Sequence, residues 1–314
     1  MQTNAIVLTE PRCIAPRELA LVDAGPDDVT VAVAWSAISS GTERLLYTGR
    51  MPAFPGMGYP LVPGYEAVGR IVAADAAGTF QAGDTVFVPG STAFKGARGL
   101  FGASASHLVV PAARVAKLEP ALGERGVLLA LAATAAHTLG KNAEPRFPEL
   151  IVGHGALGRL LARLVIALGG TPPTVWECDP ARHAGAEGYE VVDPARDGRR
   201  DYRAITDVSG DPAVLDTLVS HLAPGGEICL AGFYAEPVSF AFPPAFMREA
   251  RLRIAAQWQR EDLDLVRSLA QSGALSLDGL ITHRAAASDA GEAYATAFGD
   301  RDCLKMVLDW RASA

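Results

Sequence analysis

The stretch LIVGHGALGR, residues 150–159, decides the fold of this chain. Three apolar residues lead into glycines at positions 153, 155 and 158, and the positions after them follow the spacing of an amphipathic helix. In such a turn Gly153 permits the tight reversal, Gly155 lets a pyrophosphate approach the backbone, and Gly158 lets the helix pack closely on the strand. The spacing therefore predicts a strand, a dinucleotide-binding turn and a helix in direct succession.

The residues that follow the glycines strengthen this prediction. Ala156 and Leu157 open the expected helix, where free N–H groups and the positive end of the helix dipole face the phosphates. Glu177 stands about 20 residues beyond Gly158, where an acid that accepts the ribose hydroxyls is expected. A carboxylate there repels a 2′-phosphate and favours NAD over NADP, whereas Arg182 could accommodate that phosphate or lie on the surface. A glycine-rich turn that binds nothing stays open as an alternative.

Strand-like and helix-like segments alternate around the turn. Strand-like runs are found at 174–176, 204–208 and 227–231, and helical patterns at 160–168 and 214–222. This alternation is typical of an α/β fold with a parallel, doubly wound sheet.

The first third of the chain has a different pattern. Short β-branched runs separated by Gly, Pro and Asp stand at 5–8, 29–35, 67–72 and 85–88. The segment 50–63 is so rich in Pro and Gly that it predicts a shaped loop, either packed down or waiting for an apolar ligand. The tail is expected to hold a helix at 262–272, a helix that ends near residue 298, and a strand at 305–310.

Composition narrows the class of protein. The 314 residues are 49% hydrophobic and 20% charged, which excludes a disordered chain. A net charge of −7 argues against nucleic-acid binding and favours a small-molecule ligand. The four cysteines are scattered without CxxC spacing, and neither a secretory signal nor a membrane span is expected. We therefore expect a cytoplasmic protein.

Four short motifs resemble those of the medium-chain dehydrogenase/reductase family. They are Gly-Thr-Glu at 41–43, Pro-Gly-Tyr-Glu-Ala-Val-Gly at 63–69, Gly-Asp-Thr-Val at 83–86 and Leu-Ile-Thr-His at 280–283. The resemblance covers essentially the whole chain. It implies a GroES-like, β-rich catalytic domain at 1–134, a Rossmann domain at 135–257, and a C-terminal return to the catalytic domain at 258–314.

The departures from the family pattern concern its catalytic zinc. Zinc-dependent members carry a cysteine where this chain has Ser40 and a histidine where it has Tyr65. Glu66 would be the one matched carboxylate, and the lobe of four closely spaced cysteines is missing. The sequence therefore predicts a member that binds no metal.

Without zinc, the proton of an alcohol must leave through side chains. The candidates at the former zinc position are Ser40, Thr42, Tyr65 and Glu66, each of which could instead be structural. Thr42 resembles the hydroxyl that starts the family's proton relay. His137 could shuttle a proton at a cleft, or be a satisfied helix residue.

The resemblance also implies further cofactor contacts. Ser209 follows the fourth strand of the Rossmann unit, and Gly232 and Phe233 follow the fifth, so all three are expected beside the nicotinamide half. Lys305 resembles a basic residue that family members direct at the pyrophosphate, with a solvated lysine as the alternative.

Longer stretches narrow the resemblance to one branch of the family. GYPLVPGYEAVG at 58–69, FAFPPAFMREAR at 240–251 and CLKMVLDWR at 303–311 resemble members that act in bacteriochlorophyll synthesis. This implies that NAD accepts a hydride as the 3-(1-hydroxyethyl) group of a chlorin or bacteriochlorin becomes 3-acetyl. Residues 51–63 and 94–101 would wall the pigment, with Lys95 or Arg98 at its propionate.

Two alternative functions remain at this stage. The chain could be a zinc-free reductase of quinones or activated alkenes, or a non-catalytic protein that binds NAD or pigment. A homodimer is also expected from the family, with residues 235–240 as the pairing edge.

Overall fold

The computed structural model describes residues 1–53, 55–140 and 146–312. Its contacts divide the chain into two compact units, the first Met1–Ala130 with Asp278–Ala314 and the second Leu131–Leu277. The division falls within helix α2 (Leu129–Thr138). The domain boundaries expected after residues 134 and 257 stay predictions.

The second unit is built on a parallel sheet of six strands in the order β12-β11-β10-β13-β14-β15. In chain order they are β10 (Leu150–Val152), β11 (Thr174–Trp176), β12 (Glu190–Val192), β13 (Tyr202–Asp207), β14 (Leu222–Leu230) and β15 (Arg251–Ile254). The chain leaves β10 toward β11 and later returns to its other side with β13, so the order reverses between β10 and β13. The predicted doubly wound α/β fold is confirmed, and this reversal is where such sheets bind ligands.

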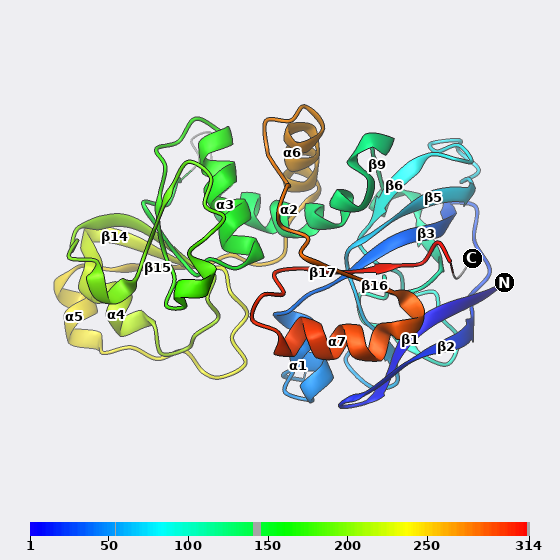
Figure 1. Ribbon diagram of the computed structural model, residues 1–314, viewed down its shortest axis with the longest axis horizontal. Coiled ribbons are helices and arrows are strands. Elements are labelled where there is room, and N and C mark those ends of the chain that lie inside the picture. The colour runs from blue at the N-terminus through cyan, green and yellow to red at the C-terminus, as the bar shows by residue number, and fades with distance from the viewer. Residues whose placement is uncertain (54, 141–145, 313–314) are drawn as a thin grey trace. The chain divides into compact units, whose positions relative to one another are not determined.

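The described part of the second unit also holds most of α2 and four further α-helices. They are α3 (Ala156–Ala167), α4 (Leu215–His221), α5 (Phe242–Met247) and α6 (Arg260–Gln271). Helix α3, green in Figure 1, follows β10 directly, and its residues Leu160, Leu161 and Leu164 are fully buried. The helix predicted at 262–272 is confirmed as α6.

The first unit is mainly antiparallel. One sheet has the order β2-β1-β4-β7, and a larger one has the order β16-β17-β3-β5-β6-β9, with β8 also paired to β3. The strands are β1 (Gln2–Glu10), β2 (Cys13–Ala20), β3 (Asp28–Ile38), β4 (Leu61–Val62), β5 (Ala67–Ala73), β6 (Thr85–Val88), β7 (Arg98–Gly99), β8 (His107–Pro111), β9 (Ala116–Lys117), β16 (His283–Ala286) and β17 (Met306–Asp309). The first unit also carries α1 (Thr42–Thr48) and α7 (Ala290–Gly299), which lie side by side in Figure 1.

The pairing of β17, β3 and β5 positions the first unit's polar residues. Met306 at the start of β17 pairs with Ile38 at the end of β3, and Ala67 at the start of β5 pairs with Ser36. The residues just before β17 and β5 therefore meet the residues just after β3 at one end of the sheet.

Part of the loop 50–63 is packed down, while residues 52, 53, 55, 56 and 60 are exposed. Met51 is 6% exposed and packs in a cluster with Leu8, Leu46 and Leu61. The Tyr59 hydroxyl donates to the Leu46 carbonyl at 2.6 Å. Phe54, within the predicted pigment wall, lies outside the described residues. The packed alternative is therefore the correct one for these side chains.

One expectation about the sheet edge is wrong. Residues 235–240 form no strand, and the outermost strand on that side is β15. The chain passes through 235–240 on its way into α5, which Phe242 begins and two prolines follow.

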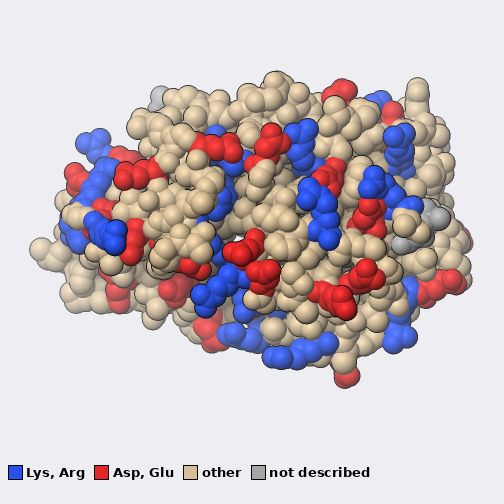
Figure 2. Space-filling view, in the orientation of Figure 1, with Lys and Arg blue, Asp and Glu red and all other residues tan. Residues whose placement is uncertain are grey.

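Across the part of the chain that the structure describes, no helix is long and apolar enough to span a bilayer. Lys and Arg are interspersed with Asp and Glu on the face drawn in Figure 2.

Candidate active site and dinucleotide site

A buried ion pair lies where β17, β3 and β5 meet. Lys305 Nζ donates to Oε2 of Glu66 at 2.5 Å and approaches the Ile38 carbonyl at 3.5 Å. The two side chains are 2% and 0% exposed. Burial raises the pKa of Glu66, and the adjacent Lys305 ammonium opposes that rise. Among the described residues, Oε1 of Glu66 has no hydrogen-bond partner, so this carboxylate retains a free acceptor.

A second buried carboxylate, Glu43, lies in the same cluster. Its Oε1 accepts from the Ser39 amide at 2.9 Å and its Oε2 from the Tyr294 hydroxyl of α7 at 2.7 Å. Burial raises the pKa of Glu43 to about 7, Glu66 adds to the rise, and Lys305 opposes it. Two carboxylates around one ammonium therefore give this cluster a group that can exchange a proton near neutral pH.

Tyr65 lies near the two carboxylates and contacts the hydroxyls of Ser39 and Thr42. Its phenol donates to Ser39 Oγ at 2.5 Å, and its half-buried ring meets Phe101 edge-on with centroids 5.2 Å apart. Burial and the charge of Glu66 raise the pKa of Tyr65 well above 10, while hydrogen bonding to Ser39 and Thr42 opposes this rise. The phenol therefore stays protonated and acts as a hydrogen-bond donor at neutral pH.

The structure brings three of the predicted catalytic residues together. Thr42, Tyr65 and Glu66 lie in this cluster. Ser40 is exposed in the turn after β3, and the neighbouring Ser39 provides the hydroxyl that Tyr65 contacts. His137 belongs to the second unit, where its Nδ1 lies 2.8 Å from Asp262 Oδ2 at the start of α6.

The side chains at the position where zinc-dependent members of the family bind their metal do not fit Zn²⁺. The ion prefers thiolate, imidazole and carboxylate ligands in tetrahedral sets. Here Tyr65 and Thr42 are neutral hydroxyls, and the Glu66 carboxylate is bound to the Lys305 ammonium. Among the described residues, no group of three or more His, Cys, Asp or Glu side chains could hold a metal ion.

The glycine turn of the second unit has the geometry of a dinucleotide cradle. Gly153 adopts a φ of +105°, and a Cβ on Gly158 would lie 1.9 Å from the Gly153 carbonyl oxygen. A Cβ on Gly155 would meet nothing within 4 Å, so the backbone there is open to a ligand. Ala156 and Leu157 are the first two residues of α3, with their N–H groups at its start. These residues fit a pyrophosphate.

Glu177 stands at the carboxyl end of β11 beside this turn. Its Oε2 accepts from the His154 amide at 3.3 Å and its Oε1 from the Asp179 amide at 2.9 Å. The carboxylate is half-buried and held in one orientation, as a ribose-binding acid requires. Arg182 ends the 3₁₀ turn η3 (Pro180–Arg182). Its carbonyl oxygen lies 2.7 Å from Nδ1 of His154 in the glycine turn.

Asp207, which the sequence prediction missed, hydrogen-bonds to residues that follow the carboxyl ends of β13 and β14. Asp207 is fully buried, accepts from the Ser209 amide at 3.0 Å and from the Tyr234 hydroxyl, and burial raises its pKa. Its carbonyl accepts from the Gly232 amide at 3.1 Å. Ser209 and Gly232 are therefore fixed at the edge where ligands bind, and Phe233 beside them is 50% exposed.

Arg98 and Lys95 are exposed on the first unit. Arg98 donates from Nη1 to the Met57 carbonyl at 3.3 Å, and a Cβ on Gly58 would lie 2.9 Å from its Nε. The guanidinium thus lies over the loop that the sequence assigns to the pigment wall.

Several site residues escaped the sequence prediction. Glu43 stood in the quoted Gly-Thr-Glu motif, and the acid of that motif was the available signal. Tyr294 is 251 residues away from Glu43 and carried no signal of its own. His154 stands between the glycines and is not among the predicted site residues, yet it is fully buried and bonded at both ring nitrogens.

Comparison with known proteins identifies the family. Residues 25–120 match the alcohol dehydrogenase GroES-like domain. The 2-desacetyl-2-hydroxyethyl bacteriochlorophyllide A dehydrogenase of Cereibacter sphaeroides is 59% identical, with 100% of each chain covered. The chain belongs to the medium-chain dehydrogenase/reductase family. The dehydrogenase of the same name from Rhodobacter capsulatus is 58% identical to this medium-chain dehydrogenase, with 99% of each chain covered.

Solved structures share the fold of this medium-chain dehydrogenase. The 2R,3R-butanediol dehydrogenase of Bacillus subtilis superposes with a TM-score of 0.84 at 20% identity, covering 98% of this chain and 99% of its own. A dehydrogenase from E. coli, complexed with NADH, gives 0.82 at 20% identity, and one from Sinorhizobium meliloti, bound to NADP, gives 0.81 at 18%; both cover 98% of this chain and 99% of their own. Neighbours with this fold thus include proteins solved with either nicotinamide cofactor.

Proposed function

We propose that this chain oxidises the 3-(1-hydroxyethyl) group of a bacteriochlorophyllide, or of the related chlorin, to a 3-acetyl group with NAD. The observation that carries the proposal is the 59% identity, over the whole of both chains, to a 2-desacetyl-2-hydroxyethyl bacteriochlorophyllide A dehydrogenase. The cluster around Tyr65 supports it, because it supplies polar groups suited to a secondary alcohol.

Oxidation of a secondary alcohol removes a hydride from carbon and a proton from oxygen. NAD, when bound, accepts the hydride, and the chain must position both partners and take up the proton. Thr42 and Tyr65 are the proposed contacts of the alcohol oxygen. The single phenol proton of Tyr65, which Ser39 Oγ accepts in the structure, would turn to the alcohol oxygen when substrate binds. Glu43 is the proposed proton-holding group, because its pKa of about 7 lets it change charge near neutral pH.

Cofactor choice follows from Glu177. Its charge is fixed at the end of β11 by two backbone amides, where the ribose hydroxyls of NAD would donate to it. A 2′-phosphate would place like charges together. We therefore assign NAD rather than NADP, and a mechanism that uses no zinc, since the hydroxyls and the paired carboxylate are poor zinc ligands.

The pigment is assigned to the first unit. Arg98 is a cation fixed over residues 57–58, suited to a propionate carboxylate, and Lys95 is a second exposed cation in the same segment. Arg98→Ala should raise the KM of the pigment and leave the KM of NAD unchanged. An unchanged pigment KM would contradict the propionate assignment.

The experiment is an absorbance scan of chelator-treated protein with 3-(1-hydroxyethyl) bacteriochlorophyllide a and NAD. An acetyl group conjugates with the ring, so turnover should shift the long-wavelength band to the red while NADH appears at the same rate. If neither change occurs until zinc is added, the metal assignment is wrong. If zinc also has no effect, the substrate assignment is wrong, and reduction of quinones or activated alkenes with NADH becomes the next assay.

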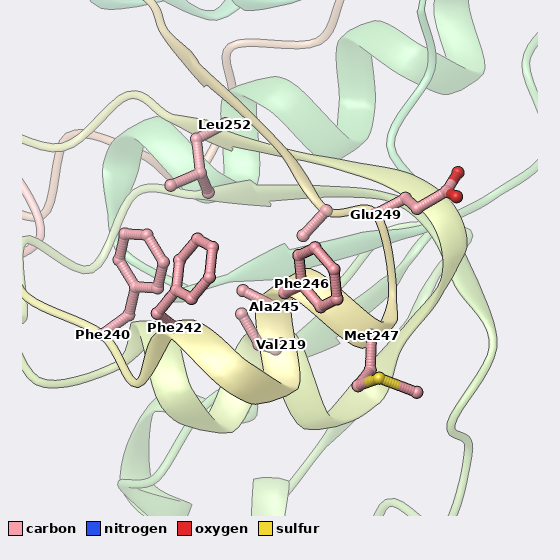
Figure 3. Close-up of a pocket in the computed structure, with 9 residues that line it drawn as sticks. Val219, Phe240, Phe242, Ala245, Phe246, Met247, Glu249 and Leu252 are labelled. Atoms are coloured by element: carbon pink, nitrogen blue, oxygen red, sulfur yellow. The ribbon is translucent and has the colours of Figure 1, made fainter.

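We also propose that the protein forms a homodimer through β15. No other strand in the described part of the chain pairs with the outer side of β15, where Leu252 and Ile254 are 42% and 69% exposed. Figure 3 shows Leu252 facing Phe240 and Phe242 across a hollow of about 510 Å³. An open strand edge flanked by apolar side chains is self-complementary when a second copy approaches antiparallel.

A further inference from the structure

Residues 177–189 form the connection between β11 and β12, and the structure describes all of them. They contain the 3₁₀ turn η3 and no α-helix. A segment without regular structure provides few of its own backbone hydrogen bonds, so other groups must hold it. Since the segment begins with Glu177, whatever holds it also shapes the proposed ribose site.

His154, the residue between the first two glycines, holds this segment. Its side chain is fully buried, its Nδ1 lies 2.7 Å from the Arg182 carbonyl oxygen, and its Nε2 lies 2.8 Å from the Tyr189 hydroxyl. A carbonyl can only accept, so Nδ1 donates and Nε2 accepts from Tyr189. Burial lowers the pKa of His154 to about 4, which keeps the ring neutral and suited to both partners.

Arg159 of α3 adds a second attachment. Its Nε donates to the His154 carbonyl at 3.1 Å, and its Nη2 donates to the Arg182 carbonyl at 3.0 Å. Gly185 has a φ of +85°, and a Cβ there would lie 2.2 Å from Nη1 of Arg159. The guanidinium therefore lies directly against the backbone of the segment.

We propose that His154, acting with Tyr189 and Arg159, is a positioning residue that preorganises the adenosine-ribose side of the dinucleotide site. The His154 amide donates to Glu177 while its ring holds Arg182 and Tyr189, so one residue links the acid, the segment and the glycine turn. This inference rests on the proposed binding of NAD. It adds a determinant of affinity that acts through Glu177 and the segment 177–189.

The test measures the dissociation constants of NAD and of AMP by calorimetry. AMP carries the adenosine half alone, so a change at that half weakens both ligands by a similar factor. His154→Ala leaves buried polar groups without partners and should weaken both about tenfold. Tyr189→Phe, which removes one hydroxyl, should weaken both by about threefold. The KM of NAD should rise by a larger factor than kcat falls.

Tyr202→Phe is the matched control. It also removes a phenol hydrogen bond, from Tyr202 to Asp197 at 2.7 Å. Tyr202 begins β13, so it lies at the amino end of this parallel strand, whereas Glu177 follows the carboxyl end of β11. Its affinities for NAD and AMP should equal those of the parent. Hydrogen exchange of residues 178–189 should accelerate in Tyr189→Phe and not in Tyr202→Phe.

Two results would overturn the inference. If Tyr189→Phe and a folded His154→Ala both bind AMP and NAD as tightly as the parent, the contacts of the His154 ring have no role in nucleotide binding. If His154→Ala does not fold, Tyr189→Phe decides alone. If the parent binds neither AMP nor NAD, the cofactor proposal fails as well, which distinguishes the two failures.

Discussion

Lys305 Nζ lies 2.5 Å from Oε2 of Glu66, and both side chains are almost completely buried. The sequence resemblance directs Lys305 at a pyrophosphate, a role that stays a prediction. In the structure its ammonium stands beside the carboxylate of the former zinc position and supplies positive charge there.

Replacement of Lys305 should destabilise the fold. Lys305→Met leaves a buried carboxylate without its cation and should lower the free energy of unfolding by about 3–5 kcal/mol, measured by urea denaturation. Lys305→Met with Glu66→Leu should recover most of the loss. Arg311→Met removes an exposed pair with Asp309 and should lower the free energy of unfolding far less. If Lys305→Met and Arg311→Met lower the free energy of unfolding equally, burial does not make the Lys305–Glu66 pair more important than an exposed pair.

Glu43 should make stability depend on pH. Its pKa of about 7 in the folded chain exceeds the ordinary value of 4.5, so the folded state binds the proton more tightly. Stability from this group is therefore full below pH 4.5 and falls as the pH rises to about 7, by about 3 kcal/mol in all. Tyr294, Glu66, Lys305 and Tyr65 surround it and are retained in the comparison variant.

The measurement compares the parent with Glu43→Gln between pH 4.5 and pH 8. The difference in unfolding free energy, parent minus variant, should decrease as pH rises and then level off. A difference that is constant over this range would show that Glu43 titrates normally in the folded protein.

Removal of the Tyr65 hydroxyl should impair chemistry more than binding. Tyr65→Phe should lower kcat with the pigment about 100-fold, because the alcohol loses its donor and the link to Ser39. The KM of NAD should not change. Tyr59→Phe, which removes a phenol hydrogen bond to Leu46 in the packed loop, is the matched control. A loss below threefold would assign Tyr65 to structure alone.

Neutralising Glu177 should relax cofactor choice. Glu177→Gln removes the charge that opposes a 2′-phosphate, so the ratio of kcat/KM for NADP to that for NAD should rise about tenfold. Glu190→Gln, on the exposed start of β12, should leave the ratio unchanged. If the ratio of kcat/KM for NADP to that for NAD rises in neither variant, another group selects the cofactor.

A charge at the open sheet edge should dissociate the dimer. Sedimentation velocity at micromolar concentration should give a dimer for the parent and a monomer for Ile254→Glu, since an acid in each copy would be buried against its partner. Val72→Glu alters a residue 48% exposed on the first unit and should remain dimeric. A monomeric parent would contradict the proposal.

Local spacing was sufficient to predict the glycine turn, because Gly153, Gly155 and Gly158 are each required by contacts within one short segment. It could not distinguish Ser39 from Ser40, since the turn after β3 decides which hydroxyl faces inward. Nor could it pair Glu43 with Tyr294, because that contact depends on α7 packing beside α1. The family resemblance placed the pairing edge at 235–240, but these residues form no strand and the open edge belongs to β15.

The pairing of β17 with β3 sets an order of events during synthesis. Residues 131–277 are synthesised before Lys305 and β17, so the sequence of the whole second unit precedes the strand that pairs with β3 on one side. In that interval Glu66 has no ammonium beside it, and Ile38 has no strand partner on that side. The buried ion pair beside Tyr65 can therefore form only after Lys305 has been made.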